Sequence, residues 1–248
     1  MDTKNIIAAI SLSAAVIIIY SLFFAPTPQE RKQIQSEKNI IKESSDTPSI
    51  EQSEQVSKIS RVEALNKQAR VYFENDSIKG SISLIGSSID DLTFKKYTKT
   101  LNGKDNIVLL NPKQVENGYY VDTGWVTTNK NIEIPSSKTI WKIEGNNKLT
   151  PNSPVKLIWT NDDDITFEKK ITIDNQYLFT VNQTIINNSG KTYDFYTYGQ
   201  IIRNKAPEVT NFYILHEGLL GVFDDQLIEE DYDDIEEKKY SINAETGW

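Results

Sequence analysis

The sequence predicts an all-β fold, a large antiparallel sandwich of two sheets, preceded by one N-terminal transmembrane helix. Three observations predict it. Residues 6–24 form an uncharged apolar run, residues 25–60 contain no aromatic side chain, and beyond residue 61 apolar residues alternate with polar ones between turn signals. We therefore divide the chain into a transmembrane anchor (1–25), a flexible linker (26–60) and a β domain (61–248).

The anchor is predicted from length and composition. No charged residue occurs between Asn5 and Gln29. A helix over Ile6–Phe24 would rise about 1.5 Å per residue and span roughly 30 Å, the thickness of the hydrocarbon layer. Pro26 and Pro28 then end the helix. A cleaved signal peptide and a buried core helix are the alternatives, but the run is longer than a signal peptide's apolar region and lacks a small-residue cleavage site.

The orientation of the anchor is left open by the charges beside it. Lys4 and the α-amino group precede the apolar run, whereas Arg31, Lys32, Lys38 and Lys42 follow it. The positive-inside rule alone would therefore place the N-terminus outside the cytoplasm.

The linker is rich in Glu, Lys, Gln and Ser and cannot bury enough apolar surface to offset its conformational entropy. A short helix around Gln33–Glu43 is the alternative. As a flexible chain of about 35 residues it has a root-mean-square reach of roughly 30–35 Å. That reach holds a folded domain close to a membrane surface.

The β domain is predicted from alternation. Ile165–Ile173 places Ile165, Phe167, Ile171 and Ile173 on one face, and Asp174-Asn175 then gives a turn signal. Return strands are predicted at Tyr177–Ile186 and Tyr193–Ile202, which together would form an antiparallel meander. The only helix candidate, a weak one, lies near Asp225–Asp231. The other predicted strands are Arg70–Phe73, Ser77–Leu84, Ile89–Phe94, Asn106–Leu110, Tyr119–Asp122, Thr139–Glu144 and Val155–Thr160.

Composition excludes several chemistries. The chain has no cysteine, a single histidine and a formal net charge of −8. Disulfides, thiolate zinc sites, iron–sulfur clusters, cysteine nucleophiles and multi-histidine metal sites are therefore excluded. The acidic balance also argues against binding to nucleic acid. We assign no catalytic, cofactor-binding or metal-binding residue and expect no cofactor.

Two clusters of polar residues are candidate sites. His216 beside Glu217 could form an acid–base pair, but neighbours on a strand point to opposite faces, so a surface or hydrogen-bonded histidine is favoured. Asp162-Asp163-Asp164 offers oxygen ligands for a hard cation, but its spacing is not that of an EF-hand. A solvated hairpin turn is the favoured interpretation of these aspartates.

Two further features concern binding. The run Asp224–Glu237 holds nine carboxylates, and removing them would leave a formal net charge of +1. Docking onto a basic partner is one interpretation, and a solvated flexible loop is the favoured one. Trp125, Trp141 and Trp159 would either line a sugar-binding groove or, as favoured, belong to the core.

The layout and several dispersed stretches resemble the N-terminal part of YidC-type membrane protein insertases of Gram-negative bacteria. The similar stretches comprise an opening strand, a threonine-phenylalanine-x-lysine strand, a tyrosine-x-hydrophobic-x-valine strand, an asparagine-rich turn, a glycine-glutamine and a final glycine-tryptophan. In this sequence they are Gly80–Tyr97, Thr166–Lys169, Tyr177–Val181, Asn187–Gly190, Gly199-Gln200 and Gly247-Trp248. Thr246 stands where the family usually has another glycine.

The resemblance implies a β-supersandwich similar to galactose mutarotases. It implies a protein that, without being an enzyme, inserts and folds nascent inner-membrane proteins, alone or with the Sec translocon and its accessory subunits. It also implies a cytoplasmic N-terminus and a periplasmic β domain, against the positive-inside count. The family's membrane-embedded groove would lie beyond Trp248, so we expect the reading frame to continue into membrane helices.

Two rival functions remain open. A mutarotase-like epimerase would need a Glu base and histidines, and His216 is the only histidine. The stronger alternative is a membrane-anchored β-sandwich that binds carbohydrate or protein.

Overall fold

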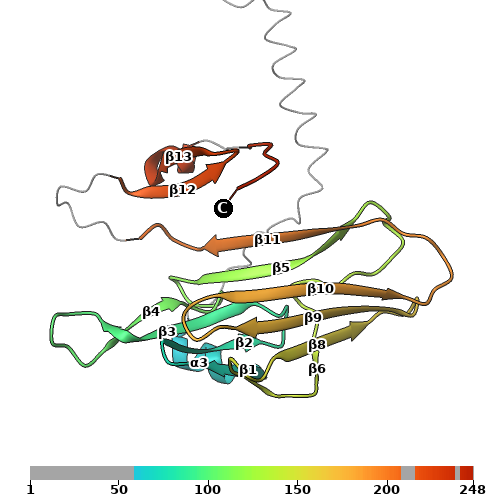
Figure 1. The fold of residues 1–248 in the computed structure, drawn as a ribbon, viewed down its shortest axis with the longest axis horizontal. Helices are drawn as coiled ribbons and strands as arrows, with labels where there is room; N and C mark the ends of the chain where they lie inside the picture. Colours follow the sequence, from blue (N-terminus) through green and yellow to red (C-terminus); the bar gives the residue numbers. More distant parts are fainter. Residues whose placement is uncertain (1–58, 208–215, 238–240, 248) are drawn as a thin grey trace, which may run out of the picture. The chain divides into compact units, whose positions relative to one another are not determined.

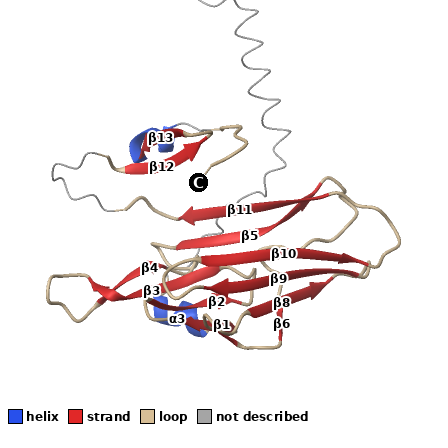
Figure 2. Cartoon of the chain, viewed as in Figure 1, coloured by secondary structure: helices blue, strands red, loops and turns tan. Residues whose placement is uncertain are grey.

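In the computed structural model the described part of the chain is built mainly from strands (Figures 1 and 2). The structure describes residues 59–207, 216–237 and 241–247. Within these ranges no helix has the length and apolar character needed to cross a bilayer. The predicted anchor and linker lie outside the described residues. The all-β prediction is confirmed for the domain.

The larger sheet has seven strands in the order β11-β5-β3-β2-β1-β7, with β4 paired to β3. A short helix, α3 (Arg61–Asn66), precedes it and is capped by the Ser60 side chain, which accepts a hydrogen bond from the Glu63 amide. The strands are β1 (Arg70–Glu74), β2 (Ile78–Ser83), β3 (Ile89–Thr98), β4 (Asn106–Leu110), β5 (Tyr119–Thr127), β7 (Lys148–Leu149) and β11 (Phe195–Arg203).

The smaller sheet has four strands in the order β10-β9-β8-β6, all antiparallel. Two of its strands, β8 (Val155–Thr160) and β9 (Ile165–Ile173), have the predicted bounds. The others are β6 (Lys142–Glu144) and β10 (Phe179–Asn187).

A shared core joins the two sheets into a sandwich. Apolar side chains of β1 and β2 belong to the same buried cluster as those of β8 and β9. Each such side chain contributes about 1.5–3 kcal/mol when it leaves water. The members contributed by these four strands are Val71, Phe73, Ile78, Ile82, Val155, Leu157, Ile165, Phe167, Ile171 and Ile173.

The predicted meander is wrong at its third strand. β10 pairs with β9 as expected, but β11 pairs along its whole length with β5 of the other sheet. The segment between β10 and β11 therefore crosses from one sheet to the other, although it begins with the predicted turn residues. One pairing, between β1 and β7, is parallel, so the predicted fully antiparallel arrangement is also corrected.

The acidic C-terminal part is ordered differently from the prediction. β12 (Gly218–Phe223) and β13 (Gln226–Asp231) form an antiparallel hairpin, and α4 (Tyr232–Glu237) follows. The run 224–237 is thus a turn, a strand and a helical turn, which corrects the flexible-loop interpretation. The helix expected at Asp225–Asp231 is a strand because its apolar residues pair across the hairpin with those of β12, as Leu227 does with Val222.

Candidate functional site

The strongest candidates for a chemical site are the buried polar side chains of the β domain. Burying a charged group is costly unless it is paired or hydrogen-bonded, so such groups deserve a functional test. The buried charged members are Asp90, Asp91 and Lys169, and the serines among them are Ser77, Ser81, Ser83, Ser87 and Ser88.

Lys169 is the most enclosed cation, with 1% of its surface exposed. Its Nζ donates a hydrogen bond to the Ser87 Oγ at 2.5 Å and another to the Thr123 carbonyl oxygen. The same amine lies 5.1 Å from the ring centre of Trp141 and 5.7 Å from that of Trp125, so it makes cation–π contacts with both. Burial lowers the pKa of Lys169 to about 8, because it disfavours the charged form.

Two carboxylates with raised pKa values belong to the same set, the buried Asp90 and the half-buried Asp122. Asp90 forms an ion pair with Arg70, and both side chains are almost fully enclosed. Burial nevertheless raises the pKa of Asp90, and the Arg70 guanidinium only partly opposes that shift. Burial also raises the pKa of Asp122, whose Oδ1 has no hydrogen-bond partner among the described residues.

A break in strand register lets adjacent carboxylates serve different partners. The pairing of β2 with β3 shifts between Ser81 and Ile82, so Asp90 has no opposite residue. Asp90 meets Arg70, whereas Asp91 accepts hydrogen bonds from Arg61 and from the Ser81 hydroxyl.

A buried amine near a carboxylate of raised pKa, as Lys169 is near Asp122, is the pattern of acid–base catalysis, but the enclosure of Lys169 argues against it here. Lys169 already donates to a hydroxyl and a carbonyl, and its side chain is closed off from solvent. A hollow of about 330 Å³ lies beside α3, where Arg61, Tyr72 and Lys148 are among the lining residues, and Lys169 is not. Lys169 therefore links β9 of the smaller sheet to β5 of the larger sheet.

The two clusters weighed from sequence behave as structural features. The His216 Nδ1 lies 3.1 Å from the Asp231 Oδ1, so the close carboxylate of His216 is that of Asp231. Asp162–Asp164 forms the turn between β8 and β9, where the Asn161 Oδ1 accepts hydrogen bonds from the Asp163 and Ile165 amides. No group of three or more metal-binding side chains comes together in the ranges 59–207, 216–237 and 241–247.

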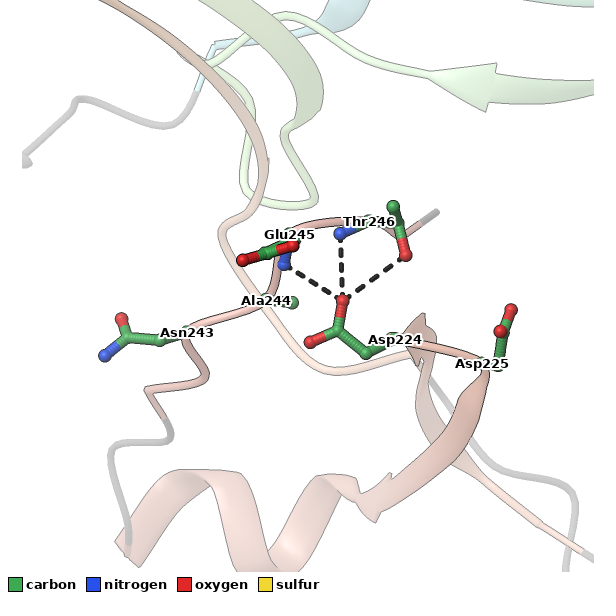
Figure 3. A pocket seen from close by; sticks show the side chains of 6 residues that line it. All are labelled: Asp224, Asp225, Asn243, Ala244, Glu245 and Thr246. Atoms are coloured by element: carbon green, nitrogen blue, oxygen red, sulfur yellow. Dashed lines mark hydrogen bonds between the residues drawn. The ribbon is translucent and has the colours of Figure 1, made fainter.

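The acidic run holds part of its own chain in place. Figure 3 shows the Asp224 carboxylate accepting hydrogen bonds from the Glu245 amide, the Thr246 amide and the Thr246 hydroxyl. The bonds from Thr246 and Glu245 lower the pKa of Asp224. A shallow hollow lies between the hairpin turn and residues 243–246. This carboxylate is a positioning group for the segment 245–246.

The tryptophans belong to the core, as favoured. Trp125 and Trp141 are each 2% exposed and stack at 6.3 Å, and Trp159 is packed against the same cluster. They are therefore not the open aromatic surface that a sugar-binding groove requires.

Comparison with known proteins decides the family. The profile of the YidC periplasmic domain matches residues 70–248, from β1 to the last residue of the chain. The chain belongs to this family. It is 58% identical over all of its 248 residues to the membrane protein insertase YidC of Pelagibacter ubique, of which it covers 44%.

Other YidC proteins match over most of the chain. The membrane protein insertase YidC of Brucella melitensis is 42% identical over 73% of the chain and 30% of its own length. That of Rickettsia bellii is 35% identical over 95% of the chain and 42% of its own length. The chain thus spans less than half the length of these YidC proteins.

Within this YidC domain, sequence reasoning missed the buried lysine. Lys169 lies on the same face of β9 as the buried Phe167 and Ile171. Its place in this alternation was the signal in the sequence that the lysine is buried. Nothing in the two-residue period indicated the register shift that separates Asp90 from Asp91.

Proposed function

We propose that this chain is the membrane-attached N-terminal part of a membrane protein insertase. The observation that carries the proposal is family membership over residues 70–248, together with YidC relatives that match the chain from end to end. The proposed activity is assistance to nascent inner-membrane proteins as they enter and fold in the bilayer. The buried polar groups support a binding and scaffolding role, since Lys169 is enclosed and already bonded.

The proposed arrangement has three parts: an anchor at 1–25, a linker at 26–60 and a periplasmic domain at 61–248. The N-terminus is proposed to lie in the cytoplasm and the domain outside the inner membrane. The uncharged run from Asn5 to Gln29 supports the anchor. The described two-sheet sandwich is compatible with a β-supersandwich of the galactose-mutarotase type, which we propose as its fold.

We also propose that the Sec translocon and its accessory subunits are partners of the whole protein. A direct test places photo-crosslinking residues at exposed positions of the domain and captures neighbours in bacterial membranes. Crosslinks to Sec subunits and to nascent membrane proteins are expected. Crosslinks to glycans or soluble proteins in their place would favour a binding module.

The activity itself is tested with the complete gene product in proteoliposomes. A small radiolabelled membrane protein is synthesised in the presence of these proteoliposomes. The fragment of it that becomes protected from added protease is then measured. Protection above that of empty liposomes is expected. An inactive gene product of proven fold would contradict the insertase proposal.

A further inference from the structure

The strands β3 and β4 extend into a hairpin arm whose charge is opposite to that of the whole chain. We define the β3–β4 arm as residues 95–107; it projects at the left of Figure 1. It carries four lysines, Lys95, Lys96, Lys99 and Lys104, and one carboxylate, Asp105. The chain as a whole has a net charge of −8, so this is a local basic surface.

The tip of the arm presents an apolar side chain to solvent. The Gly103 amide donates to the Thr100 carbonyl oxygen at 2.9 Å, and the Thr98 hydroxyl donates to the same oxygen at 2.9 Å. Asn102 has a φ of 65°, which Asn tolerates at this position of a tight turn. Leu101 stands at the corner of this turn and is 95% exposed.

The lysines nearest the tip are uncommitted. Lys99 and Lys104 are exposed and form no ion pair with any residue that the structure describes. By contrast, Lys95 is bonded to the Glu74 carboxylate and the Asn75 carbonyl oxygen, and Lys96 is bonded to Ser77. Free cations therefore flank Leu101, while the cations at the base fasten the arm.

Exposed aromatic side chains lie on the same arm and beside it. Tyr97 is about half exposed, and its ring packs edge-on against Phe94 at 5.6 Å. Tyr177 also packs edge-on against Phe94, at 5.9 Å. Leu178, next to Tyr177, is 65% exposed. Tyrosine rings with one apolar and one polar side are favoured at the headgroup level of bilayers.

We propose that the β3–β4 arm docks on a bilayer surface rich in anionic phospholipid, with Leu101 entering the interface and Lys99 and Lys104 against the phosphates. The chemistry fits in three ways. The ammonium groups complement anionic headgroups, Leu101 is removed from water, and the lysine stems reach along the interface while their charges stay at its surface. The inference rests on the proposed function only because the anchor would hold the domain within reach of a membrane.

The test uses the absence of cysteine from the chain. The full chain carrying Leu101→Cys is labelled with a polarity-sensitive fluorophore and reconstituted in vesicles of phosphatidylcholine with increasing phosphatidylglycerol. We expect a blue-shifted emission, quenched by lipids that bear a spin label near the headgroup, only when phosphatidylglycerol is present. A probe at the exposed turn residue Asn147 is expected to stay in water.

Charge variants show whether the lysines recognise the lipid. Lys99→Glu with Lys104→Glu is expected to abolish the blue shift, and arginine at both positions should retain it. Lys130→Glu with Lys191→Glu changes the net charge equally at exposed sites outside the arm and is expected to leave it intact. Single Lys→Gln changes should weaken docking about fivefold each.

Three results would overturn the proposal. They are a Leu101 probe that stays in water with phosphatidylglycerol, an equal shift in pure phosphatidylcholine, and a shift that appears only when other membrane proteins are added. The last would assign the arm to a protein partner. The first two results are obtained in vesicles without a translocon or a client, so they are independent of insertase activity.

Discussion

The sandwich and the C-terminal hairpin use charged residues in opposite ways. In the sandwich, Arg70, Asp90 and Lys169 are buried, and each has a defined partner. In the β12–β13 hairpin the carboxylates of Glu229 and Asp231 are exposed, beside exposed apolar residues such as Leu220 and Leu227. Charged side chains therefore form buried pairs in the sandwich, whereas in the hairpin they are exposed and make local contacts, such as that of Asp231 with His216. The four predictions below test this contrast, from the largest expected effect to the smallest.

Arg70→Ala should destabilise the domain most among the charge changes. It leaves the Asp90 carboxylate buried without its cation, and breaking a buried pair costs about 3–5 kcal/mol. Guanidinium unfolding of the chain in detergent, followed by tryptophan fluorescence, measures the free energy of unfolding. Lys130→Ala, an exposed change, is the control and should shift it by less than about 0.5 kcal/mol. If the two changes lowered the free energy of unfolding equally, buried paired charges would matter no more to stability than exposed ones.

Lys169→Ala should cost about 2–4 kcal/mol, because it removes a buried stem and leaves the Ser87 hydroxyl and the Thr123 carbonyl without their donor. Lys169→Met keeps most of the volume and should cost less. The same unfolding experiment separates the two contributions. If both variants unfolded like the unchanged chain, Lys169 would not tie the sheets together.

Stability should rise with pH between about 8 and 10. The pKa of Lys169 is lowered to about 8 in the folded chain, whereas an unfolded lysine titrates near 10.4, so the unfolded state binds more protons in this window. The gain should be about 2 kcal/mol and absent in Lys169→Met. The pKa values of Tyr120, about 12, and of Tyr198 are raised by burial, which reverses the trend only above pH 10. If the free energy of unfolding fell from pH 8 to 10, the pKa of Lys169 would not be lowered in the folded chain.

Neutralising the hairpin should change little. Replacing the exposed Glu229 and the half-buried Glu230 by Gln should alter sandwich stability by less than about 1 kcal/mol, as expected for charges at the surface. Asp224→Ala is expected to act only locally, by freeing the amides of Glu245 and Thr246. Hydrogen exchange at those two amides should accelerate while the core amides of β9 stay protected. Loss of protection in β9 would show that the hairpin supports the sandwich.

Sequence alone placed most strands of the sandwich, because alternation directly reports which side chains face a core. β4, β8 and β9 begin and end where predicted. Alternation does not report which strands are neighbours in a sheet. The sequence therefore predicted that β11 follows β10 in the meander, whereas β11 pairs with β5. β12 and β13 were missed because Leu219-Leu220 and Glu229-Glu230 interrupt a strict two-residue period.

The buried polar group was hidden for a related reason. Its members come from β1, β3, β5 and β9, and only the assembled sheets bring them together. A lysine on the apolar side of β9 was the single clue in the sequence. The sequence has no compact motif, so the family could be inferred only from the resemblance of several stretches scattered along the chain.

The pairing of β11 with β5 also bears on how the chain folds. These strands are aligned from Phe195 opposite Thr127 to Arg203 opposite Tyr119, so their contacts join positions about 70 to 85 residues apart. Such contacts close a long loop before they stabilise anything, and topologies of this kind reach the native state in milliseconds to seconds. During synthesis, β5 emerges well before its neighbour exists. Until the chain has been synthesised as far as Arg203, the edge of β5 that will pair with β11 has no partner strand. An unpaired edge can pair with other chains, so factors that bind the nascent chain must protect it.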